Sequence, residues 1–386
     1  MTSNDLTKRF GLGNEMKLRM YHAFAPLMFG TLILLGSGRA MASPRREKCE
    51  TAFDSTVNLT QECISTGMSA LDVRAAYAEM SNHSTPPVSQ LEPLDEVLYK
   101  WKYRRVFAGA SIYDAPNGNI IRTMGEGLSL VTYLGVIDDW VQLRQNEWVP
   151  LDQTRAYDVS TFAGVQINEP LTHPFAWMLA PARPSLYPGS PEYEGYDVIE
   201  RYQIVSVYGV EVVDGWEWYL IGPNQWLHQI RVAKVKPAQR PVEIREGELW
   251  IAVDLFEQTV VAYEGNRMAF ATLASTGLPQ WSTNEGLFKI YQRWLYGPMS
   301  GATGYLGDAY YIENIANIMY FDGDIALHAA YWHDKFGYRQ SRGCVNLSLM
   351  DAYWLYEWTR ADEDTWVYVY SSGEYRDDLP AWAVRP

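Results

Sequence analysis

A histidine and a cysteine near the C-terminal end of the chain could together carry out nucleophilic chemistry. Cys344 supplies a thiol, which reacts as its thiolate, and an imidazole such as that of His328 can generate the thiolate. Gly343 allows a tight turn beside the sulfur, and backbone N–H groups of such a turn can hold a developing oxyanion. Arg342 adds positive charge, which favours the thiolate. The pattern is typical of acyl transfer through a thioester.

Other interpretations of the same residues stay open. A Gly-Cys pair after a strand is often no more than a small buried pair. His328, His333 and Cys344 could hold zinc, but no fourth ligand is evident, so we expect neither a metal nor another cofactor. His333 fits a surface or packing position better than a second base.

Short strands and one helix are expected to position these residues. The apolar run 325–327 predicts a strand that ends at His328. Apolar residues at helical spacing predict a helix over 348–361. The stretch 294–311 is rich in glycine and aromatic residues, and it predicts a long loop, either a lid over the site or an irregular loop. Further strands are predicted over 249–254, 259–263, 288–291 and 366–370.

The order and spacing of these residues resemble the catalytic motif of the YkuD-type L,D-transpeptidases. The family pattern is a histidine, a gap of similar length, and then Ser/Thr-His-Gly-Cys-x-Asn or Arg. Here His328 stands at the expected distance from residues 341–346, which read SRGCVN. Arg342 replaces a frequent second histidine, and we expect this to alter the pKa values of the site without loss of activity.

The resemblance extends over residues 247–371, which we expect to form the catalytic domain. Residues 275–277 (STG) and 283–290 (TNEGLFKI) are similar to a conserved strand and to a T-P-x-G-x-F-x-I segment of the family. The second segment departs from the pattern because its proline is missing. The predicted final helix and strand also fit.

The resemblance implies roles for individual residues. Cys344 would be the nucleophile and His328 the general base, with the imidazole oriented by the backbone carbonyl of Ala329. The N–H groups of Gly343 and Cys344 would form the oxyanion hole, and Arg342 completes the expected catalytic set. Substrate contacts are expected from four more residues, of which the tryptophan could equally belong to the core: Ser341, Asn346, Trp332 and Met299.

The implied activity is the formation of 3→3 cross-links in peptidoglycan. The thiol would attack an L-centre carbonyl in a stem tetrapeptide, release the terminal D-residue, and pass the acyl group to an amine. Water as acceptor would make the protein an L,D-carboxypeptidase, and a non-enzymatic cell-wall-binding protein is a third alternative. Papain-like and NlpC/P60-type peptidases place Cys before His, and the sortase Thr-x-Thr-Cys motif is absent. We expect carbapenem-type inhibitors to acylate Cys344.

Residues 1–42 have the features of a secretory signal peptide, or alternatively of an uncleaved N-terminal anchor. Two basic residues precede the apolar run 23–36, and Ala40-Met41-Ala42 is a small-residue cleavage pattern. An exported protein of the cell envelope, in the periplasm or cell wall, is therefore expected. Cys49 and Cys63 could then form a disulfide, which leaves Cys344 as the odd thiol.

Two segments with a matching order of residues lie ahead of the catalytic domain. After a helical segment and linker at 43–97, residues 98–156 and 178–236 each contain short alternating runs broken by turns. Their motifs, x-Tyr-x-x-Pro, V-x-Y-x-G-V, W-x-x-V and W-V, resemble bacterial SH3-like domains. The aromatic side chains could fill two small cores, or they could stack on a glycan or peptide ligand. Residues 372–386 are expected to be a tail.

Composition supports a mainly β protein with a packed core. Of 386 residues, 47% are apolar, 14% aromatic and 20% charged. The net charge of −14 argues against a nucleic-acid partner and against simple adhesion to anionic wall polymers. We predict two small SH3-like β-barrels followed by a β-rich L,D-transpeptidase catalytic domain with a few helices.

Overall fold

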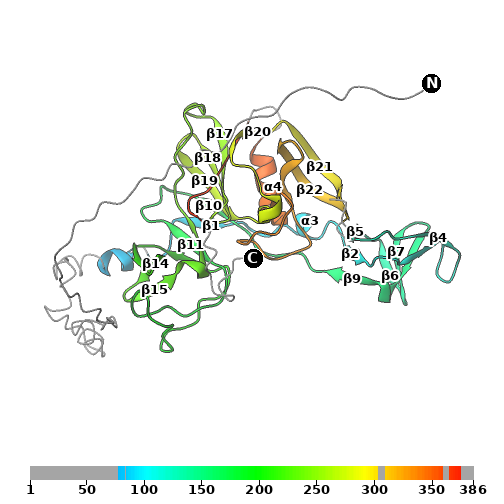
Figure 1. Cartoon of the computed structure of the whole chain (residues 1–386), viewed down its shortest axis with the longest axis horizontal. Coiled ribbons are helices and arrows are strands. Elements are labelled where there is room, and N and C mark those ends of the chain that lie inside the picture. Colours follow the sequence, from blue (N-terminus) through cyan, green and yellow to red (C-terminus); the bar gives the residue numbers. More distant parts are fainter. Residues whose placement is uncertain (1–76, 83, 303–308, 360–364, 375–386) are drawn as a thin grey trace, which may run out of the picture. The chain divides into compact units, whose positions relative to one another are not determined.

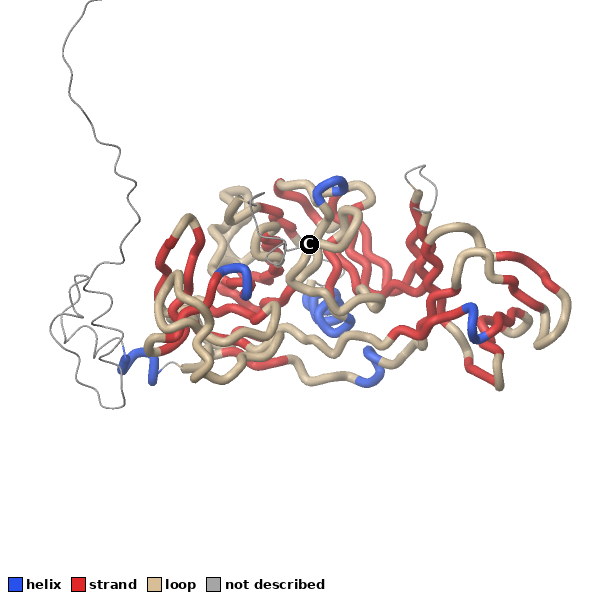
Figure 2. The backbone as a smooth tube through the Cα atoms, turned by 60° about the horizontal axis from the view of Figure 1, so that its bottom comes forward, coloured by secondary structure: helices blue, strands red, loops and turns tan. Residues whose placement is uncertain are grey.

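The computed structural model describes residues 77–82, 84–302, 309–359 and 365–374. The predicted signal segment, Cys49 and Cys63 lie outside these residues, as does most of the predicted C-terminal tail. The described part is mainly β with few helices, as predicted (Figures 1 and 2). None of its helices is long and apolar enough to cross a membrane.

One seven-stranded sheet contains the predicted strands at both ends of the catalytic region. Apolar residues alternate or run continuously in these strands because the sheet lies against packed side chains on both faces. All its neighbouring strands are antiparallel except β17 and β25, which are parallel. The order is β1 (Val88–Gln90), β10 (Val165–Ile167), β19 (Arg267–Leu273), β18 (Thr259–Glu264), β17 (Leu249–Asp254), β25 (Trp366–Tyr370) and β20 (Gly286–Lys289).

A second sheet carries the histidine and the strand that follows the cysteine. The predicted strand before His328 is β23, and it pairs in parallel with β24 and antiparallel with β22. The strand β21 (Gln292–Gly301) pairs only with β22. The order is β24 (Val345–Leu347), β23 (Ile325–Ala329), β22 (Tyr310–Asp322), β5 (Leu128–Thr132), β2 (Tyr103–Val106) and β9 (Thr154–Tyr157).

Residues 303–308 of the loop predicted over 294–311 lie outside the described residues. At 294–301 and 310–311 the prediction is wrong, because β21 and β22 form a long antiparallel pair there. Its glycines make room for aromatic rings instead of breaking the strands. A Cβ atom at Gly297 would lie 2.8 Å from the ring of Trp294, and one at Gly301 would lie 2.7 Å from Tyr310. Tyrosine and tryptophan favour extended backbone, so this composition stabilises a hairpin.

The first predicted module, 98–156, is divided between two sheets. Its strands β2, β5 and β9 join the sheet of the histidine through β22. No closed barrel is found among the described strands, so the structure does not show the SH3-like fold here. The remaining strands form a five-stranded sheet in the order β4 (Ile120–Thr123), β3 (Ser111–Tyr113), β8 (Glu147–Pro150), β7 (Trp140–Arg144) and β6 (Gly135–Ile137).

The second predicted module, 178–236, contains two three-stranded sheets. They share a small apolar core around Tyr219 and Val207. As in the first module, the strands described here do not close into a barrel, and the SH3-like fold is not shown. The sheets have the orders β12 (Ile204–Ser206), β11 (Phe175–Met178), β16 (Val232–Val235) and β13 (Gly209–Val213), β14 (Trp216–Gly222), β15 (Gln225–His228).

The segment expected to be a linker before the first module contains regular structure. Residues 77–82 are helical, β1 pairs with β10, and α3 (Asp95–Leu98) follows. β1 reads VSQ, which is too short and polar for its periodicity to reveal a strand, as is common at a sheet edge. Short 3₁₀ helices lie at Leu151–Gln153, Gln229–Arg231 and Pro279–Trp281.

The predicted C-terminal helix is α4 (Leu349–Trp358), which packs into an apolar core that contains residues of both seven-stranded sheets. Ser348 caps it, because its hydroxyl accepts the backbone N–H of Asp351 at 3.1 Å. The fully buried Asp351 carboxylate accepts the N–H of Gly164 at 2.7 Å and the hydroxyl of Thr272. One side chain therefore fastens α4 to the start of β10 and to β19.

We expect Asp351→Ala to lower the free energy of unfolding by about 3 kcal/mol, because it leaves two buried donors without an acceptor.

Burial raises the pKa of Asp351 from 3.8 to about 6. Folding thus favours the protonated carboxyl, and its contribution to stability declines as pH rises from about 4 to about 6. Urea unfolding of wild type and Asp351→Asn across this range measures the effect. If the free energies of unfolding of the two proteins changed with pH in the same way, the expected contribution of Asp351 would be contradicted.

Candidate active site

The imidazole of His328 is held by its own strand. His328 is the fourth residue of β23 and is 2% exposed. Its Nδ1 lies 3.0 Å from the backbone carbonyl of Ala329. A carbonyl only accepts hydrogen bonds, so Nδ1 carries the proton and Nε2 keeps its lone pair. The neutral ring can therefore act as a base through Nε2.

The cysteine lies at the end of a tight turn whose geometry depends on glycine and serine. Gly343 has a φ of +121°, a conformation that residues with a Cβ rarely adopt. The buried Ser341 hydroxyl accepts the N–H of Gly343 at 3.1 Å and donates to the carbonyl of Cys344. Ser341 therefore helps to build the turn, and its expected contact with substrate stays a prediction. The predicted oxyanion role of the Gly343 N–H stays a prediction, since this group already has a partner.

A buried threonine connects the upstream segments to this turn. The Thr283 hydroxyl accepts the N–H of Gly277 at 3.0 Å and donates to the carbonyl of Gly343 at 2.7 Å. Isolated bridges pair Ser275 with Asn346 and Gly277 with Ser341. The two upstream segments that resemble the family, 275–277 and 283–290, therefore both contact the backbone around Cys344 and hold it in place.

Burial keeps the thiol and the imidazole neutral at pH 7. The pKa of Cys344 rises to about 11 because burial disfavours the thiolate, while the N–H of Ala326 opposes this in part. Burial lowers the pKa of His328 to about 4. Arg342 is not among the groups that shift the pKa of Cys344, so its expected effect on the thiolate stays a prediction. The Arg342 guanidinium lies 4.9 Å from the ring centre of Trp281 and 5.0 Å from that of Tyr310.

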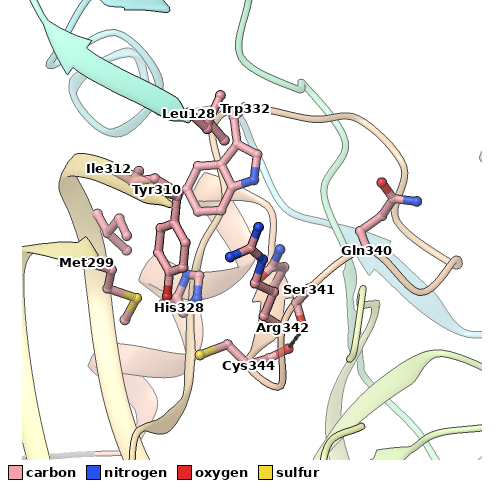
Figure 3. Close-up of a pocket in the computed structure, with 12 residues that line it drawn as sticks. Leu128, Met299, Tyr310, Ile312, His328, Trp332, Gln340, Ser341, Arg342 and Cys344 are labelled. Carbon is pink, nitrogen blue, oxygen red and sulfur yellow. Dashed lines mark hydrogen bonds between the residues drawn. The ribbon is translucent and has the colours of Figure 1, made fainter. Parts of the chain in front are cut away.

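The histidine and the cysteine line one pocket of about 140 Å³. Figure 3 shows Leu128 and Trp332 at one end of it and Cys344 at the other. Seven of the nine predicted site residues line this pocket, while Gly343 and Ala329 act through the turn and the strand. The seven are Cys344, His328, Arg342, Ser341, Asn346, Trp332 and Met299.

Residues 248–369 match the family model of the YkuD-type L,D-transpeptidase catalytic domain. This region is a YkuD-type catalytic domain. Among solved structures, an Enterococcus faecium L,D-transpeptidase is 23% identical, with 32% of this chain and 50% of that chain covered and a TM-score of 0.29. An L,D-transpeptidase from Stackebrandtia nassauensis is 25% identical, with 33% and 57% covered and a TM-score of 0.26.

A third solved structure is the catalytic domain of the E. faecium L,D-transpeptidase acylated by ertapenem. It is 22% identical, with 33% of this chain and all of that chain covered and a TM-score of 0.29. The chain thus spans about half the length of the two longer solved proteins. No curated protein matches it.

Five residues that line this pocket were not predicted from the sequence. Tyr310, Ile312 and Ile315 come from β22, whose many isoleucine and aromatic residues could have indicated a strand. Gln340 lies beside the catalytic turn. Leu128 belongs to β5, outside the matched residues, and it enters the pocket only through the pairing of β5 with β22. Such long-range pairing leaves no local sequence signal.

Asn346, which lines the pocket, contacts His333. The side-chain amide of Asn346 lies 3.1 Å from Nε2 of His333. Burial and the neighbouring His328 lower the pKa of His333 to about 4, so this ring is also neutral at pH 7. Within the described ranges, no group of three or more His, Cys, Asp or Glu side chains could hold a metal ion.

Proposed function

We propose that this protein is a peptidoglycan L,D-transpeptidase that forms 3→3 cross-links through a thioester on Cys344. The observation that carries the proposal is the thiol and the neutral imidazole of His328 in one pocket of a YkuD-type domain. Because both groups start neutral, the proton moves from sulfur to Nε2 as the sulfur attacks.

The proposed reaction has two halves. In the first, sulfur bonds to the carbonyl carbon at the L-centre of the third stem residue, and the oxyanion lies at the N–H groups of the turn. The C–N bond then breaks, and the imidazolium returns its proton to the leaving amine of the terminal D-residue. In the second, an amine of another stem peptide attacks the thioester, gives a proton to His328, and releases the thiol.

The other pocket residues are proposed to hold the stem peptide. Trp332 and Met299 provide apolar surface, and Asn346 provides an amide. The exposed guanidinium of Arg342 can pair with a carboxylate of the peptide. If water replaced the amine acceptor, the same acyl-enzyme would make the protein an L,D-carboxypeptidase.

We also propose that the protein acts in the cell envelope, where peptidoglycan lies, and that the region 178–236 binds wall material. A pocket of about 210 Å³ in this region supports the second point, because Trp218, Trp226 and His228 line it beside Arg231. Aromatic faces with a charged rim suit a glycan or a peptide. This binding function is separate from the chemistry of Cys344.

The test of the enzymatic function is incubation of the protein with disaccharide-tetrapeptides, followed by liquid chromatography and mass spectrometry. We expect loss of the terminal D-residue and appearance of a dimer linked between two third residues. Ertapenem should add its mass to the protein, with the adduct on the peptide that contains Cys344. A product without dimers would indicate the carboxypeptidase. If the protein neither released the D-residue nor formed an ertapenem adduct, the enzymatic role would be contradicted.

A further inference from the structure

The pocket of the catalytic domain is built partly by a segment that lies far outside it in sequence. β5 runs parallel to β22, with Leu128 opposite Tyr310 in the register. The N–H of Leu128 donates to the carbonyl of Ala309 at 2.8 Å. The approach is close, because a Cβ atom at Gly127 would lie 2.0 Å from that carbonyl oxygen. Only glycine fits there.

The carboxylate of Glu313 adds side-chain bonds between the two segments to this backbone pairing. Glu313 of β22 accepts the backbone N–H of Thr132 at 3.1 Å, its hydroxyl at 3.2 Å, and the guanidinium of Arg144. Arg144 also donates to the carbonyl of Thr132 at 3.0 Å. The Glu313 side chain is 15% exposed, so its bonds to Thr132 are largely shielded from water, whereas the Arg144 side chain is 45% exposed and its ion pair is partly screened by salt.

The same region supports the far end of the pocket. The ring of Tyr103 in β2 stacks on Tyr331, with 3.5 Å between ring centres. The Tyr331 hydroxyl donates to the carbonyl of Glu313 at 3.0 Å, and its chain neighbour Trp332 lines the pocket. Figure 3 shows Leu128 beside Trp332 and Ile312, where the three form an apolar wall.

We propose that the first β region, residues 103–157, forms part of the substrate site. Leu128 contacts an apolar group of the stem peptide and thereby sets specificity. Glu313 is a positioning residue, which holds Tyr310 and Ile312 against the pocket through β22. The inference rests on the proposed function. It predicts that damage to this junction weakens substrate binding more than it slows the chemistry.

Two variants and one matched control test the inference. Leu128→Ala removes the proposed contact with the stem peptide. Glu313→Gln weakens the bonds that join β22 to Thr132 and Arg144. Glu147→Gln removes another ion pair, the 2.9 Å bridge between Glu147 and Arg122, which lies within the five-stranded sheet. For release of the terminal D-residue, we expect both test variants to raise KM about tenfold and to leave kcat within about twofold. The control should match wild type.

Hydrogen exchange separates this inference from the proposed function, because it does not require activity. Amides of residues 310–316 should exchange faster in Glu313→Gln than in Glu147→Gln. If the wild type released no D-residue, the proposed function would fail, and exchange would still decide whether Glu313 fastens the hairpin. Unchanged exchange in Glu313→Gln would overturn the positioning role. A fall in kcat with unchanged KM in Leu128→Ala would overturn the substrate contact.

Discussion

Replacing Cys344 by alanine should lower the rate of D-residue release by on the order of 10⁴-fold or more, because no thioester can form. The variant should still fold. The thiol is half-buried in the pocket, and its contact with the carbonyl of Asp324, at 3.7 Å, is weak. Mass spectrometry of tetrapeptide products measures the release, and ertapenem should leave no adduct on the variant.

Cys344→Ser is the matched control for shape. A hydroxyl fills nearly the same space, but it ionises far less readily than a thiol, so the variant should bind substrate and react very slowly. Binding of the tetrapeptide to both variants, followed by Trp fluorescence or calorimetry, should equal that of wild type. If Cys344→Ala still released the terminal D-residue, the assignment of the nucleophile would be wrong.

Local sequence signals were sufficient for much of the catalytic domain. β17 and β18 are short apolar runs, and Glu264, Gly265 and Asn266 mark the turn from β18 into β19, so sequence patterns located these strands closely. Ser348 and the apolar spacing behind it similarly marked the start of α4. These features depend on residues that are neighbours along the chain.

The errors arose where residues distant in sequence decide the outcome. The β21–β22 hairpin contains glycines that normally suggest a loop, and only their packing under Trp294 and Tyr310 explains a strand. Leu128 reaches the pocket through a pairing with β22, about 180 residues away, that no periodicity reports. The raised pKa of Cys344 was not anticipated, because it follows from burial, which the sequence does not display.

The neutral resting pair has a chemical consequence. With a pKa of about 11, the thiol is ionised in about one molecule in 10⁴ at pH 7. A resting thiolate would react with any electrophile that entered the pocket. A thiol that is deprotonated only during attack reacts with substrates that are already aligned with both sulfur and imidazole. The burial of this pair thus favours selectivity over general reactivity.

Removing the base should therefore be nearly as damaging as removing the nucleophile. We expect His328→Gln to lower the rate of acylation by ertapenem at pH 7 on the order of 10³-fold, because the rare thiolate must then react unaided. Its residual rate should rise about tenfold per pH unit as pH increases toward 11, in step with the thiolate fraction.

The wild type should behave differently over the same range. Its rate falls below a pH of about 4, where His328 gains a proton and loses its lone pair, and it is level from about 5 to about 10, because the neutral pair keeps the same protons throughout. His333→Gln is the control, since that ring contacts Asn346 and is not placed in the proton transfer. Stopped-flow acylation across pH measures all three proteins. A wild-type rate that climbs with pH as steeply as that of His328→Gln would show that His328 is not the base.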